Sequence, residues 1–250
     1  MSFDPQNELE RLLIKAMSDA ASRPLFYREL AQSNIFTVQR DAPSAERQEH
    51  TINAGETIEI HHIEYEGQQY IPIFSSLAQL QAVTSSDVAY LEVNALDFMK
   101  ITLGTPLLLN PGSEYGKEFP PSEVAAILDG SLWQTTEEYS LTQETQIMIG
   151  DPATHPDELI NALESFFATK PQVRRAWLAH FYNPSDELPP HTLIAFECDG
   201  DYRDILQEAG VVIQGVEVPD PPVDLLPITG EGGLEDYFLN EAEPFYQQPA

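Results

Sequence analysis

The feature that most constrains the fold is an alternation, along the whole chain, between segments of helical and of strand periodicity. From Leu9 to Ala20 the apolar residues recur about every 3.6 positions, which predicts an amphipathic helix. Thr57–Tyr65 and Gln69–Phe74 are rich in residues typical of strands and flank a Glu66-Gly67 turn, so they predict a hairpin. Interspersed helices and hairpins imply an α+β (mixed α/β) class with mixed or antiparallel sheets.

Capping residues and turn signals place the other elements. Asp4 and Pro5 are typical of a helix start, so we expect the first helix to begin there. Ser76 and Asn94 are expected to cap two later helices. Further helices are expected from Pro24, Pro121, Asp157, Tyr202 (ending at Gly210) and Glu235, and further strands over Ile35–Val38, Val88–Val93, Thr105–Leu109, Gln146–Ile149, Val173–Phe181, Thr192–Glu197 and Val211–Val218.

A chain of 250 residues is long enough for two domains of ordinary size. The Gly150-Asp151-Pro152 sequence interrupts the pattern, and the alternation of helices and strands then starts again. We therefore predict two α/β domains, residues 1–150 and 151–250, each with a mixed or antiparallel sheet and helices packed on it.

Charge excludes several classes of function. The 12 Lys and Arg against 41 Asp and Glu give a formal net charge of −29. Such a chain repels phosphate, so we expect no nucleic-acid binding and no polybasic membrane-surface binding. No run approaches 18 apolar residues, so we expect no membrane span. The acidic start of the chain does not resemble a secretory signal and Cys198 is the single cysteine, which together predict a cytoplasmic protein without disulfides.

Two segments superficially resemble ligand sites. Gly112 to Lys117 has three residues between its glycines and is followed by Glu118, whereas a phosphate loop needs four residues and then Ser or Thr. Glu197, Asp199 and Asp201 form an acidic cluster at a predicted strand end, but the spacing does not fit a calcium-binding loop. We interpret the cluster as a solvated turn before the next helix.

The single cysteine and the histidines also show no pattern that is specific for a catalytic or metal site. Cys198 has no identifiable base partner in the sequence and is expected to be a small buried apolar residue. His61 and His62 are adjacent in a predicted strand, so their side chains point to opposite faces and do not share a metal ion. We therefore expect no catalytic residues, no cofactor and no metal.

Several strings resemble one protein family. In the first half they are Asn7-Glu8-Leu9-Glu10, Arg23-Pro24, Ile71 to Leu77, Leu103-Gly104, Leu107 to Pro111 and Tyr115-Gly116-Lys117-Glu118-Phe119; in the second half they are Lys170 to Ala176, Glu197-Cys198-Asp199-Gly200-Asp201 and Pro244-Phe245-Tyr246. They resemble the N-terminal and C-terminal domains of the enhanced serine sensitivity protein B (SseB) family. The resemblance implies a link to serine sensitivity and carries no catalytic residues; related N-terminal domains near secretion and toxin–immunity loci imply a partner-binding role.

Two groups of residues are candidates for contact with a partner. In the first, Tyr115 and Phe119 flank Lys117 and Glu118 in a predicted loop, a setting that often carries recognition. In the second, acids alternate with aromatic residues near the C-terminus: Asp236, Tyr237, Phe245 and Tyr246. From Asp204 to Ala250 there are ten acids and no Lys or Arg, so this region is suited to attract a basic protein.

The leading hypothesis is a soluble, non-enzymatic SseB-like protein that acts by protein–protein binding. One alternative is an immunity protein that blocks a secreted, basic toxin through acidic complementarity. The other is a regulator or enzyme of amino-acid metabolism, which the link to serine would favour.

Overall fold

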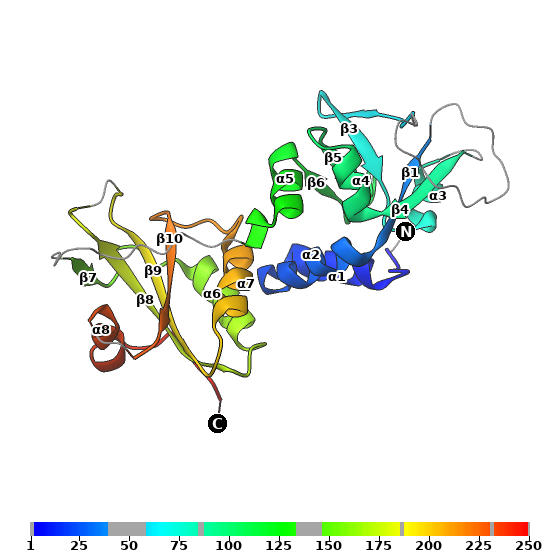
Figure 1. Ribbon diagram of the computed structural model, residues 1–250. Helices are drawn as coiled ribbons and strands as arrows, with labels where there is room; N and C mark the ends of the chain where they lie inside the picture. The colour runs from blue at the N-terminus through cyan, green and yellow to red at the C-terminus, as the bar shows by residue number, and fades with distance from the viewer. Residues whose placement is uncertain are drawn as a thin grey trace. The chain divides into compact units, whose positions relative to one another are not determined.

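The computed structural model describes residues 3–39, 59–84, 88–133, 147–185, 188–230 and 233–249. It divides into two compact units (Figure 1). The first consists of Met1–Ser18 and Leu25–Leu132, and the second of Asp19–Pro24 and Trp133–Ala250. A short segment from the first fifth of the sequence therefore belongs to the second unit.

The helices of the first half are α1 (Glu8–Ser18), α2 (Arg23–Gln32), α3 (Leu77–Val83), α4 (Ala95–Ile101), α5 (Pro121–Asp129) and the 3₁₀ turn η2 (Ser131–Trp133). The predicted caps of α3 and α4 are confirmed, because the side-chain oxygens of Ser76 and Asn94 accept hydrogen bonds from first-turn amides. The predicted start of α1 at Asp4 was wrong. Asn7 is the capping residue, and its Oδ1 accepts a 2.9 Å hydrogen bond from the amide of Glu10.

The strands of the first unit are β1 (Asn34–Val38), β2 (Ile63–Tyr65), β3 (Gln68–Ile73), β4 (Tyr90–Asn94), β5 (Leu107–Leu109) and β6 (Lys117–Phe119). Four of them form a sheet in the order β2-β3-β5-β6, in which only β3 and β5 are parallel. Strands β1 and β4 form an antiparallel pair. Two 2.8 Å backbone hydrogen bonds between Phe36 and Phe74 join this pair to the end of β3.

The second unit contains the 3₁₀ turn η1 (Ala20–Ser22), β7 (Met148–Gly150), α6 (Asp157–Phe167), β8 (Val173–Tyr182), β9 (His191–Cys198), α7 (Arg203–Ile213), β10 (Val223–Ile228), α8 (Leu234–Asn240) and β11 (Tyr246–Gln247). Its sheet has the order β10-β9-β8-β11, and β7 also pairs with β8. Only β9 and β10 are parallel. Mixed sheets and packed helices in both units confirm the predicted α+β class.

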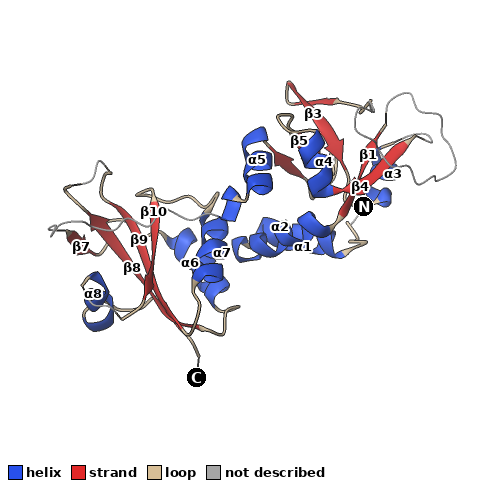
Figure 2. Ribbon diagram, in the orientation of Figure 1, coloured by secondary structure: helices blue, strands red, loops and turns tan. Residues whose placement is uncertain are grey.

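The two faces of the second sheet are covered differently. On one face, strand residues such as Ala176 and Phe196 pack with α6 and α7 in a large buried cluster. On the other face, Trp177 and Ala195 pack under α8, in a smaller cluster centred on Phe238. Figure 2 shows α8 on one side of the strands, with α6 and α7 on the other. Successive residues of a strand point to opposite faces, which is why neighbours such as Ala176 and Trp177 belong to different clusters.

The turn η1 is an integral part of the second unit. Ala21 is buried in the cluster formed with α6 and α7. The side chain of Asp19 accepts a hydrogen bond from the Ala21 amide, and Arg23 Nη1 donates to the carbonyl oxygens of Val212 and Gln214 at the end of α7. These contacts satisfy carbonyl groups that a helix end leaves without partners.

One predicted strand was wrong. The prediction ended a helix at Gly210 and placed a strand over Val211–Val218, but α7 continues to Ile213. Val211 and Val212 have at most 1% of their surface exposed, so burial outweighs the strand preference of valine. The left-handed glycine that follows the helix is Gly215, with φ of 74°, and the next strand is β10.

Candidate partner-binding site

The first group of predicted contact residues is mostly part of an edge strand. Lys117–Phe119 forms β6, which pairs with β5 at the edge of the sheet. Phe119 has no exposed surface and belongs to the hydrophobic core, so its assignment as a contact residue is corrected. Tyr115 is half-buried and packs edge-on against Phe3, with 5.0 Å between ring centroids.

Lys117 and Glu118 are both engaged within the first unit. Lys117 Nζ lies 2.9 Å from Glu123 Oε1 and 4.8 Å from the centroid of the Phe119 ring. Glu118 is exposed and accepts a 2.8 Å hydrogen bond from the hydroxyl of Tyr70, which raises the pKa of that tyrosine. Because the charge of Lys117 is neutralised by Glu123, this lysine is a poor anchor for phosphate, which agrees with the failed phosphate-loop pattern.

The family-like strings of the first half converge on a buried polar network. Glu10, Ser75 and Asn110 are each at most 1% exposed. Ser75 Oγ donates to Glu10 Oε1 over 2.7 Å, and the amide of Ser75 donates to Asn110 Oδ1 over 2.9 Å. Asn7 Nδ2 donates to the carbonyl of Ser75 over 2.7 Å. The network therefore ties the start of α1 to the segments that follow β3 and β5.

Gly116, in the Tyr-Gly-Lys-Glu-Phe string, lies against the backbone of Leu109 and Asn110, next to the buried polar network. A Cβ atom at Gly116 would lie 3.0 Å from the carbonyl oxygen of Leu109 and 3.2 Å from that of Asn110. Only glycine permits so close an approach of two backbone segments. The most specific string of the first half is thus explained by packing.

The second group of predicted contact residues is divided between the two faces of its sheet. Asp236 and Tyr237 lie on α8, in the helix that covers the smaller cluster. Phe245 and Tyr246 pack in the cluster on the α6–α7 face. Tyr246 is only 9% exposed and its hydroxyl donates to the carbonyl of Phe167, so it anchors the C-terminal segment instead of presenting a contact surface.

The structure brings α8 next to β7. Ile149 of β7 and Tyr237 of α8 are both half-buried and pack on the same cluster. Burial raises the pKa of Tyr237, and the nearby carboxylates of Asp151 and Glu241 raise it further. Asp151, Asp236 and Glu241 are exposed. We call this set of five residues the α8 surface. Asp151 and Ile149 were missed from the sequence, since only the pairing of β7 with β8 places them there.

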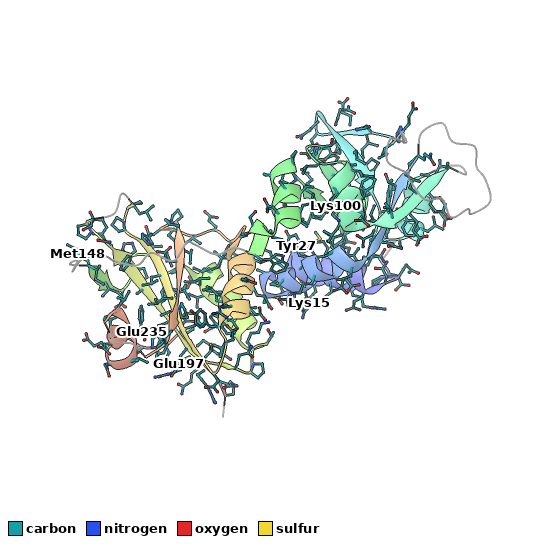
Figure 3. All side chains as sticks on the ribbon, in the orientation of Figure 1. Lys15, Tyr27, Lys100, Met148, Glu197 and Glu235 are labelled. Atoms are coloured by element: carbon teal, nitrogen blue, oxygen red, sulfur yellow. The ribbon has the colours of Figure 1, made fainter. Side chains whose placement is uncertain are left out.

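The position of α8 is fixed by Glu235 (labelled in Figure 3). Its Oε1 accepts hydrogen bonds from the amide and the hydroxyl of Thr229, at 3.0 and 2.9 Å, and its Oε2 accepts one from the amide of Gly230 at 2.6 Å. Glu235 is 8% exposed. This carboxylate holds Thr229 and Gly230, which follow β10, against the first turn of α8. These hydrogen bonds fix the position of the helix that carries Asp236 and Tyr237.

Ion pairs engage most of the basic side chains in the described ranges. The pairs between Lys or Arg and an acid are Arg11–Glu8, Lys100–Asp97, Lys117–Glu123, Lys170–Glu208, Arg174–Asp199, Arg175–Glu197 and Arg203–Asp201. Within these same ranges, no Lys or Arg side chain pairs with Asp151, Asp236 or Glu241. No cation of the described part of the chain therefore offsets the negative charge of the α8 surface.

The acidic cluster after β9 has local partners for each of its carboxylates. Arg175 pairs with Glu197 and Arg174 with Asp199, while Asp201 accepts a 3.0 Å hydrogen bond from the amide of Arg203 where α7 begins. This agrees with the interpretation as a turn before a helix. Over the described residues, no group of three or more His, Cys, Asp or Glu side chains is arranged to hold a metal ion.

The structure also places Cys198 and the neighbouring pair His61 and His62. Cys198 is half-buried, and burial together with Asp199, Asp201 and Glu197 raises the pKa of its thiol. A raised pKa keeps the thiol protonated near neutral pH, where the thiolate is the nucleophile. His61 and His62 are exposed and lie just before β2.

Comparison with known proteins now decides the family. The model of the SseB protein N-terminal domain matches residues 9–126, and the model of the SseB protein C-terminal domain matches residues 141–248. The chain belongs to the SseB family. Its resemblance to that family, expected from the sequence strings, is confirmed in both halves.

Two SseB relatives match nearly the full length. Protein SseB of Escherichia coli (strain K12) is 29% identical over 247 residues, which cover 98% of this chain and 93% of the relative. Protein SseB of Shigella flexneri matches with the same identity and coverage. A comparison with solved structures finds no match. Among the helices that the structure describes, none is long and apolar enough to cross a membrane.

Proposed function

We propose that this SseB-family chain is a non-enzymatic protein that acts by binding a protein partner, and that the α8 surface takes part in the contact. The observation that carries the proposal is the half-buried ring of Tyr237 on the smaller cluster, with the exposed acids Asp151, Asp236 and Glu241, which pair with no Lys or Arg among the described residues. Aromatic residues with one polar end are favoured anchors at protein interfaces, and surrounding charges accelerate encounter with an oppositely charged partner.

The first group of contact residues contributes less to this proposal. Tyr115 and Glu118 retain exposed surface, but Phe119 is in the core and Lys117 is paired with Glu123. An edge strand with such side chains also has a structural explanation, because charged residues on a short edge strand oppose unwanted pairing. The α8 surface is therefore the better target for a binding experiment.

Affinity capture from native lysate at low salt tests the proposal. We expect a reproducible partner with the unchanged chain and its loss with the double variant Asp236→Asn, Tyr237→Ala. The matched control is Asp4→Asn, Tyr65→Ala, which removes one exposed acid and one exposed aromatic ring in the first unit. A partner that the α8 double variant captures as well as the unchanged chain would contradict the proposal.

A metabolic role makes a different prediction. A chain that binds serine or a related amino acid should be stabilised by it, because a ligand that binds only the folded state raises the melting temperature. A thermal-shift panel of serine, related amino acids and divalent ions therefore separates the two roles. Stabilisation by serine, together with turnover that one substitution abolishes, would replace the binding proposal.

A further inference from the structure

The apolar cover of the second sheet is incomplete on the face of α8. The buried part of this cluster comprises only Trp177, Ala179, Leu193, Ala195 and Phe238. Around them the apolar side chains are only partly buried: Ile149, Phe181, Leu226, Ile228, Leu234, Tyr237, Leu239 and Ala242. A seven-residue helix is too short to cover a sheet face, so apolar surface is left beside it.

The side of α8 that faces β7 combines this apolar surface with unpaired acids. Ile149 and Tyr237 come from segments almost ninety positions apart and pack on one cluster. Glu241 lies one helical turn after Tyr237, because its amide donates a 2.9 Å hydrogen bond to the Tyr237 carbonyl, and Asp151 directly follows β7. Both carboxylates raise the pKa of the Tyr237 hydroxyl. Among the described residues β7 pairs only with β8, so its other edge is not paired with a strand there.

A polar group below this surface also lacks a partner. The Nε1–H of Trp177 is buried and, within the described residues, has no hydrogen-bond acceptor. Trp177 belongs to the cluster that Ile149 and Tyr237 cover, and its ring centroid lies 6.2 Å from that of Phe238. A buried donor without an acceptor is costly, and such a group in a native protein calls for an explanation such as a bound water or ion.

The negative charge of the α8 surface limits the kind of partner that can bind there. A second copy of the chain would bring another acidic surface, and a nucleic acid or an anionic lipid surface would be repelled. A guanidinium or ammonium group would meet Asp151 and Glu241 and could also lie over the Tyr237 ring, where a cation is attracted to the aromatic face. Apolar side chains next to the cation would cover Ile149.

We propose that the surface between α8 and β7 binds a polypeptide segment in which Arg or Lys alternates with aliphatic side chains. This inference rests on the proposed function and specifies its partner. The cations pair with Asp151 and Glu241, the aliphatic side chains pack on Ile149 and Tyr237, and the open edge of β7 accepts the extended backbone of the segment.

The test uses the full chain and two synthetic peptides. One peptide alternates Leu and Arg over eight residues, and the other has Gln in place of each Arg. We expect the Arg peptide to bind in isothermal titration calorimetry and the Gln peptide to bind about tenfold more weakly, since two exposed charge pairs together contribute about 1.4 kcal/mol, or tenfold in affinity. Amide resonances of residues 149–151 and 234–242 should shift on titration.

Two isosteric variants decide the location. Asp151→Asn, Glu241→Gln should weaken binding of the Arg peptide about tenfold or more. The control pair Glu114→Gln, Glu217→Gln removes two exposed acids elsewhere and should change binding by less than about twofold, because distant exposed charges are screened by salt. Equal weakening by both pairs, or no weakening by the first, would overturn the inference.

The two proposals fail in different ways. In one outcome, capture of a partner depends on Asp236 and Tyr237, but the Arg peptide binds the Asp151–Glu241 variant as tightly as the control variant. The partner then binds at α8 without a basic segment, and only this inference is wrong. If no capture depends on α8, the proposed function itself falls.

Discussion

The Oγ of Ser75 donates a 2.7 Å hydrogen bond to Oε1 of Glu10, and both side chains are at most 1% exposed. The second oxygen of Glu10 accepts a 2.6 Å hydrogen bond from the amide of Gln6. A buried carboxylate is tolerated only where hydrogen bonds replace its water. In this chain they come from Gln6, four positions before Glu10, and from Ser75, 65 positions after it.

We expect Glu10→Ala to destabilise the first unit by about 2–3 kcal/mol, because it removes the acceptor of the Gln6 amide and the nearer acceptor of the buried Ser75 hydroxyl, which then has only Asn110 Oδ1 at 3.1 Å. Glu10→Gln should cost less, since its amide retains one acceptor oxygen. Urea unfolding followed by circular dichroism measures both. The control is Glu8→Gln on the exposed side of α1, which should change stability by less than about 0.5 kcal/mol. Equal effects of the two glutamine substitutions would refute a special role for Glu10.

Arg23 is the contact by which the Asp19–Pro24 segment holds the end of α7. Its guanidinium donates to the carbonyl oxygens of Val212 and Gln214, where the helix dipole is negative. Arg23→Ala should therefore destabilise the second unit by about 1–3 kcal/mol and should speed hydrogen exchange in the last turn of α7. Arg11→Ala, which loses only an exposed ion pair with Glu8, is the control. Unchanged exchange in α7 would show that Arg23 contributes nothing there.

Local signals in the sequence were sufficient for elements whose caps and periodicity agree. Leu159, Leu163 and Phe167 follow one stripe, and α6 forms where this stripe predicts it. Ser76 and Asn94 cap their helices because a side-chain oxygen close to a free amide acts over two or three residues. Such features need no knowledge of the rest of the chain.

The candidate site could not be predicted in the same way, because it depends on pairing between distant segments. Tyr237 and Tyr246 are nine positions apart, yet they lie on opposite faces of one sheet since β11 pairs at the edge of β8. Asp151 joins Tyr237 only through the pairing of β7 with β8. Phe119 had the pattern of an exposed loop residue, and the pairing of β6 with β5 buried it.

Gly116 offers a sharp test of the close approach between two backbone segments. A Cβ atom there would lie 3.0 Å from the Leu109 carbonyl oxygen, and backbone cannot move as easily as a side-chain end. We expect Gly116→Ala to destabilise the first unit by about 1–3 kcal/mol. Gly150 is the matched control, because its Cβ would meet no atom within 4 Å and its backbone is not in the left-handed region. A Gly116→Ala variant as stable as Gly150→Ala would mean that the segments separate at little cost.

Cys198 should react slowly with alkylating reagents while the chain is folded. Burial, then Asp199, Asp201 and Glu197, raise the pKa of its thiol in the folded chain. At pH 8 the folded chain therefore holds less thiolate than the unfolded chain, so iodoacetamide should alkylate it at least about threefold more slowly in buffer than in denaturant. Asp199→Asn, Asp201→Asn removes two of the charges that oppose ionisation and should speed alkylation of the folded chain. The control Glu217→Gln lies elsewhere on the second unit and should leave the rate unchanged. Alkylation as fast in the folded as in the unfolded chain would contradict the raised pKa. Cys198 would then again be a candidate nucleophile.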